Sequence, residues 1–203
     1  MDESNDDIKI IILGETGVGK TNLMNVYFDK EFQENPESTM VSYCMQDEIK
    51  YEKKMYKYCM WDTAGQEKYK GITKLFIRKA KIILLVYAID NLTSFKEIDT
   101  WINMVKTNID NDKYIMALVA NKSDLFESQE VTDDEGKELA EKYEIDFLVT
   151  SALLKAKSFK NFVDKQIIKY IKMIEGNGEA NEKNNHIKIK NSKKEDKNKK
   201  KCC

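Results

Sequence analysis

The chain has 203 residues, of which 41% are hydrophobic and 34% charged, and its formal net charge is -1. This length and composition suit one folded domain with a tail, and they allow a sizeable hydrophobic core. The small net charge hides an asymmetry, because residues 176–203 carry nine lysines against four acidic residues, which leaves about -6 on residues 1–175. An acidic body with a basic tail disfavours nucleic-acid binding and favours a tail that meets an anionic membrane surface.

The apolar runs, the cysteines and the single histidine narrow the possible classes of function further. The longest apolar run, residues 82–89, is too short to span a bilayer, and residues 1–7 lack the features of a signal peptide, so we expect synthesis in the cytosol. The four cysteines show no metal-ligand spacing and are expected to be free thiols. The only histidine, His186, lies in the tail, which excludes most hydrolase mechanisms built on a Ser-His or Cys-His pair in the body.

Five strands are expected within the first 120 residues. Residues 8–13, 82–88 and 115–120 are short and nearly continuous apolar runs, which are typical of parallel strands covered on both faces. Two strand-like segments within residues 41–62 flank residues 50–53. This arrangement predicts a hairpin with one antiparallel edge strand.

Helices are expected between the strands, because apolar side chains recur at spacings of three and four. A short helix should follow the first strand over residues 22–28. The spacing itself occurs in two stretches: Phe95, Ile98, Ile102, Val105 and Ile109, and then Phe159, Val163, Ile167, Ile171 and Ile174. The alternation predicts an α/β fold, with a mostly parallel sheet, right-handed crossovers and helices on both faces. We expect the domain to comprise residues 1–175, because the composition of residues 176–203 is typical of a disordered segment.

A phosphate loop is the first candidate site. Residues 14–21 match GxxxxGK[ST] between an apolar strand and a helical segment, which is the context that this motif requires. Small residues let backbone N–H groups turn toward a polyphosphate, and the following helix presents its positive end. Lys20 would contact the β- and γ-phosphates, and Thr21 would ligate Mg²⁺. The nucleotide-binding residues predicted here are Glu15, Thr16, Gly17, Val18, Gly19, Lys20, Thr21 and Asn22.

A second candidate site would read the base. Asp124 follows the strand 115–120 and offers a carboxylate that can accept from two adjacent donors on guanine, which adenine lacks. Ser151 and Ala152 follow the next strand and would place backbone N–H groups near the base oxygen. The predicted base-side residues are Asn121, Lys122, Asp124, Leu125, Ser151, Ala152 and Leu153. A P-loop ATPase remains an alternative, and a preference for ATP over GTP would favour it.

Two polar segments would complete the site. Asp62 could hold Mg²⁺ through a water, the Gly65 N–H could reach a γ-phosphate, and Gln66 could orient the attacking water. Thr39 stands 19 residues after Lys20 and could join Mg²⁺ only while the γ-phosphate is present, so hydrolysis would release it and change the shape of the protein. The predicted catalytic residues are Gln66, Lys20 and Thr39, and the predicted metal ligands are Thr21, Thr39 and Asp62.

In their order and spacing, these motifs resemble the Ras superfamily over residues 8–174, and residues 61–69 together with the terminal Cys202 and Cys203 are most similar to Rab proteins. The resemblance implies a six-stranded P-loop GTPase fold, binding of GTP or GDP with Mg²⁺, and a switch in vesicle-mediated membrane traffic. It implies an exchange factor, a GTPase-activating protein, an escort protein or GDP-dissociation inhibitor, and effectors as partners. It places the protein on the cytoplasmic face of an intracellular membrane, exchanging with the cytosol.

The resemblance also assigns residues outside the two sites. Phe32 would pack on the guanine face, and Cys202 and Cys203 would carry geranylgeranyl groups, because stable anchoring needs two lipids. The predicted effector surface comprises Met40, Cys44, Trp61, Tyr69 and Phe76. Val41 and Cys44 replace a glycine and a phenylalanine that are usual in Rab proteins, so the identity of the effectors stays open.

Slow intrinsic hydrolysis is expected, because nothing in the chain resembles an arginine finger, which an activating protein would have to supply. One alternative is a recruitment module that binds GTP or GDP and hydrolyses negligibly. A Gln66→Leu substitution separates the two, since it should reduce turnover only in a working GTPase.

Overall fold

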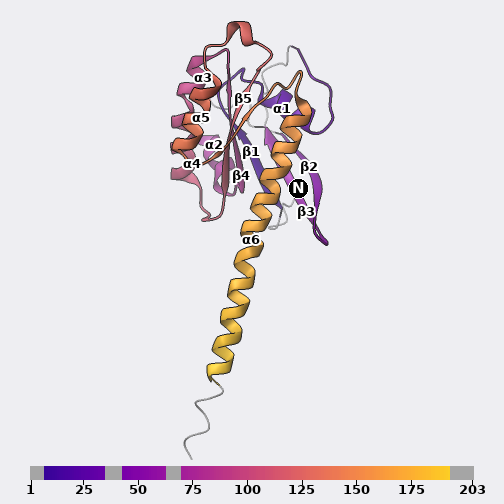
Figure 1. Cartoon of the computed structure of the whole chain (residues 1–203), viewed down its shortest axis with the longest axis vertical. Helices are drawn as coiled ribbons and strands as arrows, with labels where there is room; N and C mark the ends of the chain where they lie inside the picture. The colour runs from indigo at the N-terminus through magenta and orange to yellow at the C-terminus, as the bar shows by residue number, and fades with distance from the viewer. Residues whose placement is uncertain (1–6, 35–42, 63–69, 193–203) are drawn as a thin grey trace, which may run out of the picture.

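The computed structural model describes residues 7–34, 43–62 and 70–192. Six strands in these residues form one sheet in the order β2-β3-β1-β4-β5-β6, with helices on both sides (Figure 1). The strands are β1 (Ile8–Leu13), β2 (Tyr43–Tyr51), β3 (Lys54–Asp62), β4 (Ile82–Ala88), β5 (Ile115–Asn121) and β6 (Asp146–Val149). The edge strand β2 pairs antiparallel with β3, and every other neighbouring pair is parallel. The predicted mixed sheet with one antiparallel edge is therefore confirmed.

Two layers of helices cover the sheet. The helices are α1 (Lys20–Tyr27), α2 (Lys70–Arg78), α3 (Leu92–Lys96), α4 (Ile98–Asn108), α5 (Asp133–Lys142) and α6 (Ala156–Ser192), with a short 3-10 turn over Phe126–Ser128. Side chains of α1 and α6 share one hydrophobic cluster with the sheet, and side chains of α2, α4 and α5 share the other. The central strand β4 is buried along its whole length. Its side chains alternate between the two clusters, which is the pattern that a strand covered on both faces requires.

The helix predicted over the apolar spacing from Phe95 to Ile109 is present as two adjoining helices. Glu97 lies between them, as the C-cap residue of α3 and the N-cap residue of α4. The Asn91 side chain caps α3 by accepting from the Ser94 N–H. The buried Ser94 hydroxyl accepts from the Ala88 N–H at 3.1 Å and donates to the Asn91 carbonyl at 2.7 Å. These bonds tie the first helical turn to the end of β4, and the longer helix starts one turn later.

A buried group of polar side chains joins the phosphate-loop helix to the rest of the body. The Tyr27 hydroxyl on α1 lies 2.9 Å from the Tyr58 hydroxyl on β3 and 2.8 Å from Asp164 Oδ1 on α6. Burial raises the pKa of Tyr58 to about 12 and holds the pKa of Tyr27 still higher, so both phenols stay protonated at neutral pH. Three elements that are distant in sequence are thus held together beneath the sheet.

Two tyrosines provide a matched test of this packing. The hydroxyl of Tyr87, which is fully buried, has no hydrogen-bond partner in the described part of the chain. Tyr87→Phe should therefore change the free energy of unfolding by less than about 1 kcal/mol, or stabilise the fold, because no bond is lost. Tyr27→Phe should cost about 1–3 kcal/mol, because the Asp164 carboxylate loses a partner. Urea denaturation measures both values, and a larger loss for Tyr87→Phe would contradict these assignments.

The last helix extends beyond the body. Composition predicts disorder from residue 176, whereas α6 continues to Ser192 and projects away from the sheet (Figure 1). A segment that cannot build a core can still form a helix, because helical hydrogen bonds are made within the segment itself. The remaining tail residues, including Cys202 and Cys203, lie outside the described residues. Among the helices of the described ranges, none is long and apolar enough to cross a membrane.

Candidate functional site

The site predicted from the sequence assembles at the carboxyl ends of the parallel strands. The phosphate loop follows β1, Asp62 ends β3, the segment beginning at Asn121 follows β5, and Ser151 follows β6. Parallel strands bring their carboxyl ends to one edge of the sheet, which is where open α/β sheets bind ligands. Val18 and Asn121, which are 103 positions apart in the chain, are therefore in contact here.

Glycines give the phosphate loop its path. Gly14, Gly17 and Gly19 all have positive φ, at 150°, 82° and 94°. A Cβ atom on Gly14 would lie 2.1 Å from the Val86 carbonyl oxygen, and one on Gly19 would lie 2.4 Å from Asn121 Nδ2. Only glycine fits at these two positions without movement of the backbone or of Asn121. At Gly17, by contrast, a Cβ atom would meet nothing within 4 Å, so only the backbone conformation favours glycine there.

Lys20 is held inside the loop. Its side chain is 3% exposed, and Nζ donates to the Gly14 carbonyl at 2.6 Å and to the Glu15 carbonyl at 2.8 Å. A buried ammonium group needs such partners, because an unpaired buried charge is costly. The loop therefore wraps around a fixed positive charge at the first turn of α1, as expected for a phosphate-binding lysine.

Thr21 and Asp62 meet at the same edge. Thr21 Oγ1 donates to Asp62 Oδ2 at 2.7 Å, and Asp62 is completely buried. Tyr43, which pairs with Asp62 across the hairpin, has its pKa raised by burial and by the Asp62 charge. A hydroxyl and a carboxylate in contact are oxygen ligands of the kind that Mg²⁺ prefers.

Asn121 joins the phosphate loop to the base-side loop. Its side chain is 1% exposed, Nδ2 donates to the Val18 carbonyl at 2.8 Å, and Oδ1 accepts from the Ala152 N–H at 3.2 Å. Ser123 N–H adds a bond to the Thr150 carbonyl at 3.0 Å. The Asn121 amide thus braces two loops against each other, a positioning role that its place in the motif alone does not reveal.

The side chain of Asp124 is oriented by Ser151. The Ser151 hydroxyl donates to Asp124 Oδ1, and its oxygen accepts from the Leu153 and Leu154 N–H groups at 3.1 and 3.0 Å. Asp124 is partly exposed, so its second oxygen can accept from a ligand. Leu125 and Leu153, which lie close to Asp124 and Ser151 in the chain, are 40% and 51% exposed. The arrangement leaves one carboxylate oxygen of Asp124 open to a ligand.

Asp90 is a site residue that the sequence reasoning missed. The Lys122 ammonium lies 3.6 Å from Asp90 Oδ2. Lys122 itself has φ of 63°, a strained conformation for a residue with a side chain. The signal that could have identified Asp90 was its position, because it is an acidic residue two places after the buried strand β4.

The Asn22 side chain holds a neighbouring backbone segment in place. Its Nδ2 donates to the Gln33 carbonyl at 2.8 Å and its Oδ1 accepts from the Gln33 N–H at 3.0 Å. The adjacent Phe32 is half-buried and packs against the cluster beneath α1 and α6. The Asn22 side chain therefore fixes the segment that carries Phe32.

Part of the predicted effector surface is visible. Cys44 and Trp61 are directly paired between β2 and β3, and the rings of Trp61 and Phe76 have centroids 5.3 Å apart. The ammonium group of Lys9 lies 5.2 Å from the Trp61 ring centroid and 5.5 Å from that of Phe76. Leu75, which precedes Phe76 in the chain, is 64% exposed. Cys44, Trp61 and Phe76 thus form one partly apolar surface with a cation above it.

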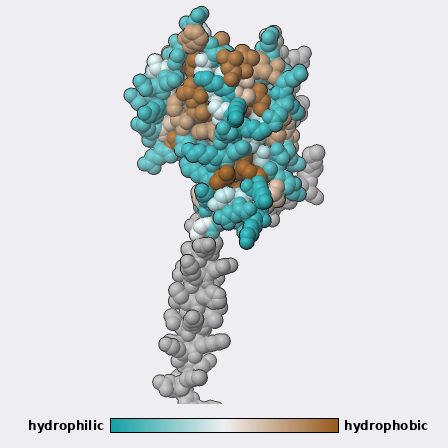
Figure 2. Space-filling model, turned by 45° about the vertical axis from the view of Figure 1, so that its right-hand side comes forward, coloured by the Kyte–Doolittle hydropathy of each residue, from teal (hydrophilic) through white to brown (hydrophobic). Residues whose placement is uncertain are grey.

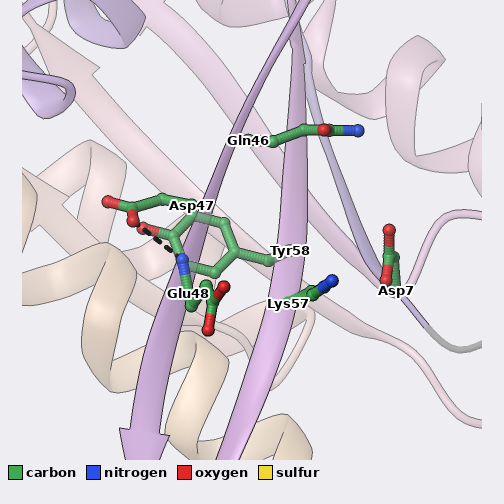
Figure 3. Close-up of a pocket in the computed structure, with 6 residues that line it drawn as sticks. All are labelled: Asp7, Gln46, Asp47, Glu48, Lys57 and Tyr58. Carbon is green, nitrogen blue, oxygen red and sulfur yellow. Dashed lines mark hydrogen bonds between the residues drawn. The ribbon is translucent and has the colours of Figure 1, made fainter.

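Other predicted site residues fall outside the described ranges. These are Thr39, Met40, Gly65, Gln66 and Tyr69, together with Cys202 and Cys203. A cavity of about 320 Å³ on the β2–β3 hairpin (Figure 3) contains none of the predicted site residues. Its lining residues are Asp7, Gln46, Asp47, Glu48, Lys57 and Tyr58. The candidate site therefore rests on the strand ends and not on this cavity.

The strand order and the phosphate loop together define a P-loop GTPase fold. A model of the Ras family matches residues 9–174. Rab-11B and Rab-11A of Dictyostelium discoideum are each 42% identical to the chain over 145 residues, which cover 71% of it and 66% and 67% of those proteins. The protein rab-11.1 of Caenorhabditis elegans is 38% identical over 152 residues, covering 75% of the chain and 72% of the relative.

The chain therefore belongs to the Ras family, and within that superfamily it is a small GTPase of the Rab type. It spans about two thirds of the length of the Dictyostelium relatives that it matches.

Proposed function

We propose that the chain is a GTP/GDP switch in vesicle-mediated membrane traffic, which binds guanine nucleotide with Mg²⁺ and slowly hydrolyses GTP to GDP. The observation that carries this proposal is the convergence of the buried Lys20 ammonium with the Thr21–Asp62 pair at one edge of the sheet. A fixed positive charge beside two oxygen ligands suits a polyphosphate with a divalent cation. Membership of the Ras family supports the same function.

The donor set fits Mg²⁺. No group of three or more His, Cys, Asp or Glu side chains that could hold a metal occurs in the described ranges. The ion would therefore share its coordination between Thr21, Asp62 and oxygen atoms of the phosphates and water, which matches the preference of Mg²⁺. Thr39 is proposed as the ligand that joins only in the GTP state. When bound, the ion would neutralise charge on the β- and γ-phosphate oxygens.

Residues of the chain itself would bind the phosphates and the base and position the attacking water. The loop N–H groups and Lys20 bind the phosphates, Asp124 accepts from the guanine donors, and Asn121 keeps the two loops in register. Gln66 would orient the attacking water. With no arginine finger recognised in the chain, an activating protein would supply the positive charge that speeds the reaction.

Partners and location follow from the tail and the effector surface. We propose that geranylgeranyl groups on Cys202 and Cys203 hold the protein on the cytoplasmic face of an intracellular membrane, with an escort protein or GDP-dissociation inhibitor returning it to the cytosol. An exchange factor would reload it, and effectors would dock on Cys44, Trp61 and Phe76. The basic charge of the tail supports the membrane assignment.

Thr21→Ala tests the proposed metal site. In the unsubstituted protein, chelation of Mg²⁺ should accelerate release of a fluorescent GDP analogue at least about tenfold, because the ion links phosphate to protein. In Thr21→Ala, release should already be fast and chelation should add little. Thr107→Ala is the control, because within the described residues the Thr107 hydroxyl bonds only to the Asn103 carbonyl on the exposed side of α4. A strong effect of chelation that persists in Thr21→Ala would contradict the assignment.

A further inference from the structure

The outer face of α6 carries a row of lysines. Lys157, Lys165, Lys169 and Lys172 are exposed and recur at helical spacing, so they share one stripe along the helix. Lys169 also contacts Asp146 at 2.8 Å, and the Lys172 ammonium lies 6.0 Å from the Tyr51 ring centroid. Lys157 and Lys165 form no salt bridge with any of the described residues.

The acidic residues of the same helix segment are engaged with the body. Asp164 Oδ1 lies 2.8 Å from the Tyr27 hydroxyl. Glu175 Oε1 accepts from Lys54 Nζ at 2.9 Å and from the Tyr56 hydroxyl. These bonds commit both carboxylates to α1 and to the β2–β3 hairpin. The lysine stripe is thus not neutralised by Asp164 or Glu175, the acidic residues of the part of α6 whose side chains are described.

The stripe is unusual for its surroundings. Residues 1–175 together carry a net charge of about -6, yet α6 presents a basic face. The helix has 37 residues and a length of about 55 Å, and it leads directly into the lysine-rich tail. On the face shown in Figure 2, the surface of the body near the point where α6 leaves it is largely hydrophilic, with a compact hydrophobic patch above. A long helix with a basic face, joined to a basic tail, can bind an extended anionic surface.

We propose that α6 lies along an anionic lipid bilayer with its lysine stripe toward the headgroups, so that the folded body, and not only the tail, contacts the membrane. This proposal rests on the proposed function, because that function places the protein at a membrane. The lysine stripe itself does not depend on that function. Charge complementarity and continuity with the basic tail favour a bilayer. A single-stranded nucleic acid is less well matched, because the exposed residues of this stripe include no aromatic side chain on which bases could stack.

The test uses the full chain without attached lipid and measures its partition onto vesicles. One set of vesicles is phosphatidylcholine alone, and the other also contains phosphatidylserine. The stripe variant combines Lys157→Glu, Lys165→Glu and Lys172→Glu. The control combines Lys96→Glu, Lys106→Glu and Lys137→Glu on α3, α4 and α5, which changes net charge equally and also removes one cation–ring contact, since Lys106 lies 5.0 Å from the Tyr143 ring centroid.

The stripe variant should bind phosphatidylserine vesicles at least about tenfold more weakly than the unsubstituted chain, because each lysine at an anionic surface contributes on the order of fivefold. The control should lose at most about threefold, and phosphatidylcholine alone should bind none of the proteins. Equal losses in both variants would overturn the proposal, because the tail or net charge would then explain binding. Weaker binding to an RNA oligonucleotide with unchanged vesicle binding would also overturn it.

A measurement of GDP binding distinguishes failure of this proposal from failure of the proposed function. GDP binding by both variants should match that of the unsubstituted chain, because the stripe lies outside the nucleotide site. If the stripe variant fails to fold, the triple substitution to glutamine removes the same charges without adding acids and should show the same ranking against its control. Failure of the unsubstituted chain to bind GDP would contradict the proposed switch but leave the vesicle comparison intact.

Discussion

Replacing Lys20 with alanine is expected to weaken GTP binding at least about 100-fold, which is close to 3 kcal/mol. The Lys20 ammonium is buried and already positioned by the Gly14 and Glu15 carbonyls, so it can bind phosphate oxygens with little loss of side-chain entropy. Hydrogen bonds to charged groups contribute about 1.5–3 kcal/mol each, and two phosphates share this lysine in the proposed complex.

A second lysine provides the control for this prediction. The Lys160 ammonium also makes a short ionic contact, at 2.7 Å to Asp29, but neither residue is among the predicted site residues. Lys160→Ala should leave GTP affinity within about twofold, because an exposed ion pair contributes little. Titration calorimetry of both variants gives the affinities, and circular dichroism confirms that they are folded. Nearly equal affinities for Lys20→Ala and the unsubstituted chain would remove Lys20 from the site.

Replacing Asn121 with alanine is expected to lower both stability and GTP affinity. The buried amide bonds to the Val18 carbonyl and to the Ala152 N–H, and both backbone groups would lose their partner. Two lost bonds and two unsatisfied groups should cost about 2–4 kcal/mol of unfolding free energy. GTP affinity should fall at least about 30-fold, because the ligand must then order the two loops itself.

Asn111→Ala makes the same chemical change elsewhere. Asn111 Nδ2 donates to the Ala80 carbonyl at 2.9 Å. These residues precede β5 and β4, at the opposite ends of the strands from the base-side loops, and are not part of the predicted site. This variant should lose about 1 kcal/mol of stability and bind GTP normally. Urea denaturation and GTP titration separate the two effects. If Asn121→Ala unfolds more easily but binds GTP as tightly as Asn111→Ala, the brace has a structural role only.

The fold was largely predictable because most of its strands can be recognised from the local sequence alone. Residues 8–13 and 82–88 are continuous or nearly continuous apolar runs, and the strands begin and end at those residues. The strand β6, Asp146–Val149, is harder to predict, because it has four residues and all are only half-buried. The capping box of Thr132 and Glu135 at the start of α5 was not predicted, although the spacing of these two residues is typical of that motif.

The candidate site was predictable as a set of residues but not as a set of contacts. The motifs gave Thr21 and Asp62 as separate metal ligands, whereas their 2.7 Å contact depends on the pairing of β1 with β3. The tyrosine pair Tyr27 and Tyr58 depends likewise on the packing of α1 beneath the sheet. Such contacts join residues that are distant in sequence, and no local pattern encodes them.

Single-turnover hydrolysis of preloaded GTP, with Gln66→Leu measured alongside, tests the central claim most directly. A working switch should convert GTP to GDP slowly, and the substitution should reduce that rate at least about tenfold, because a residue that orients the attacking water is lost. Tight GTP binding with no conversion by either protein would contradict the account. It would favour a recruitment module that depends on a partner for any catalysis.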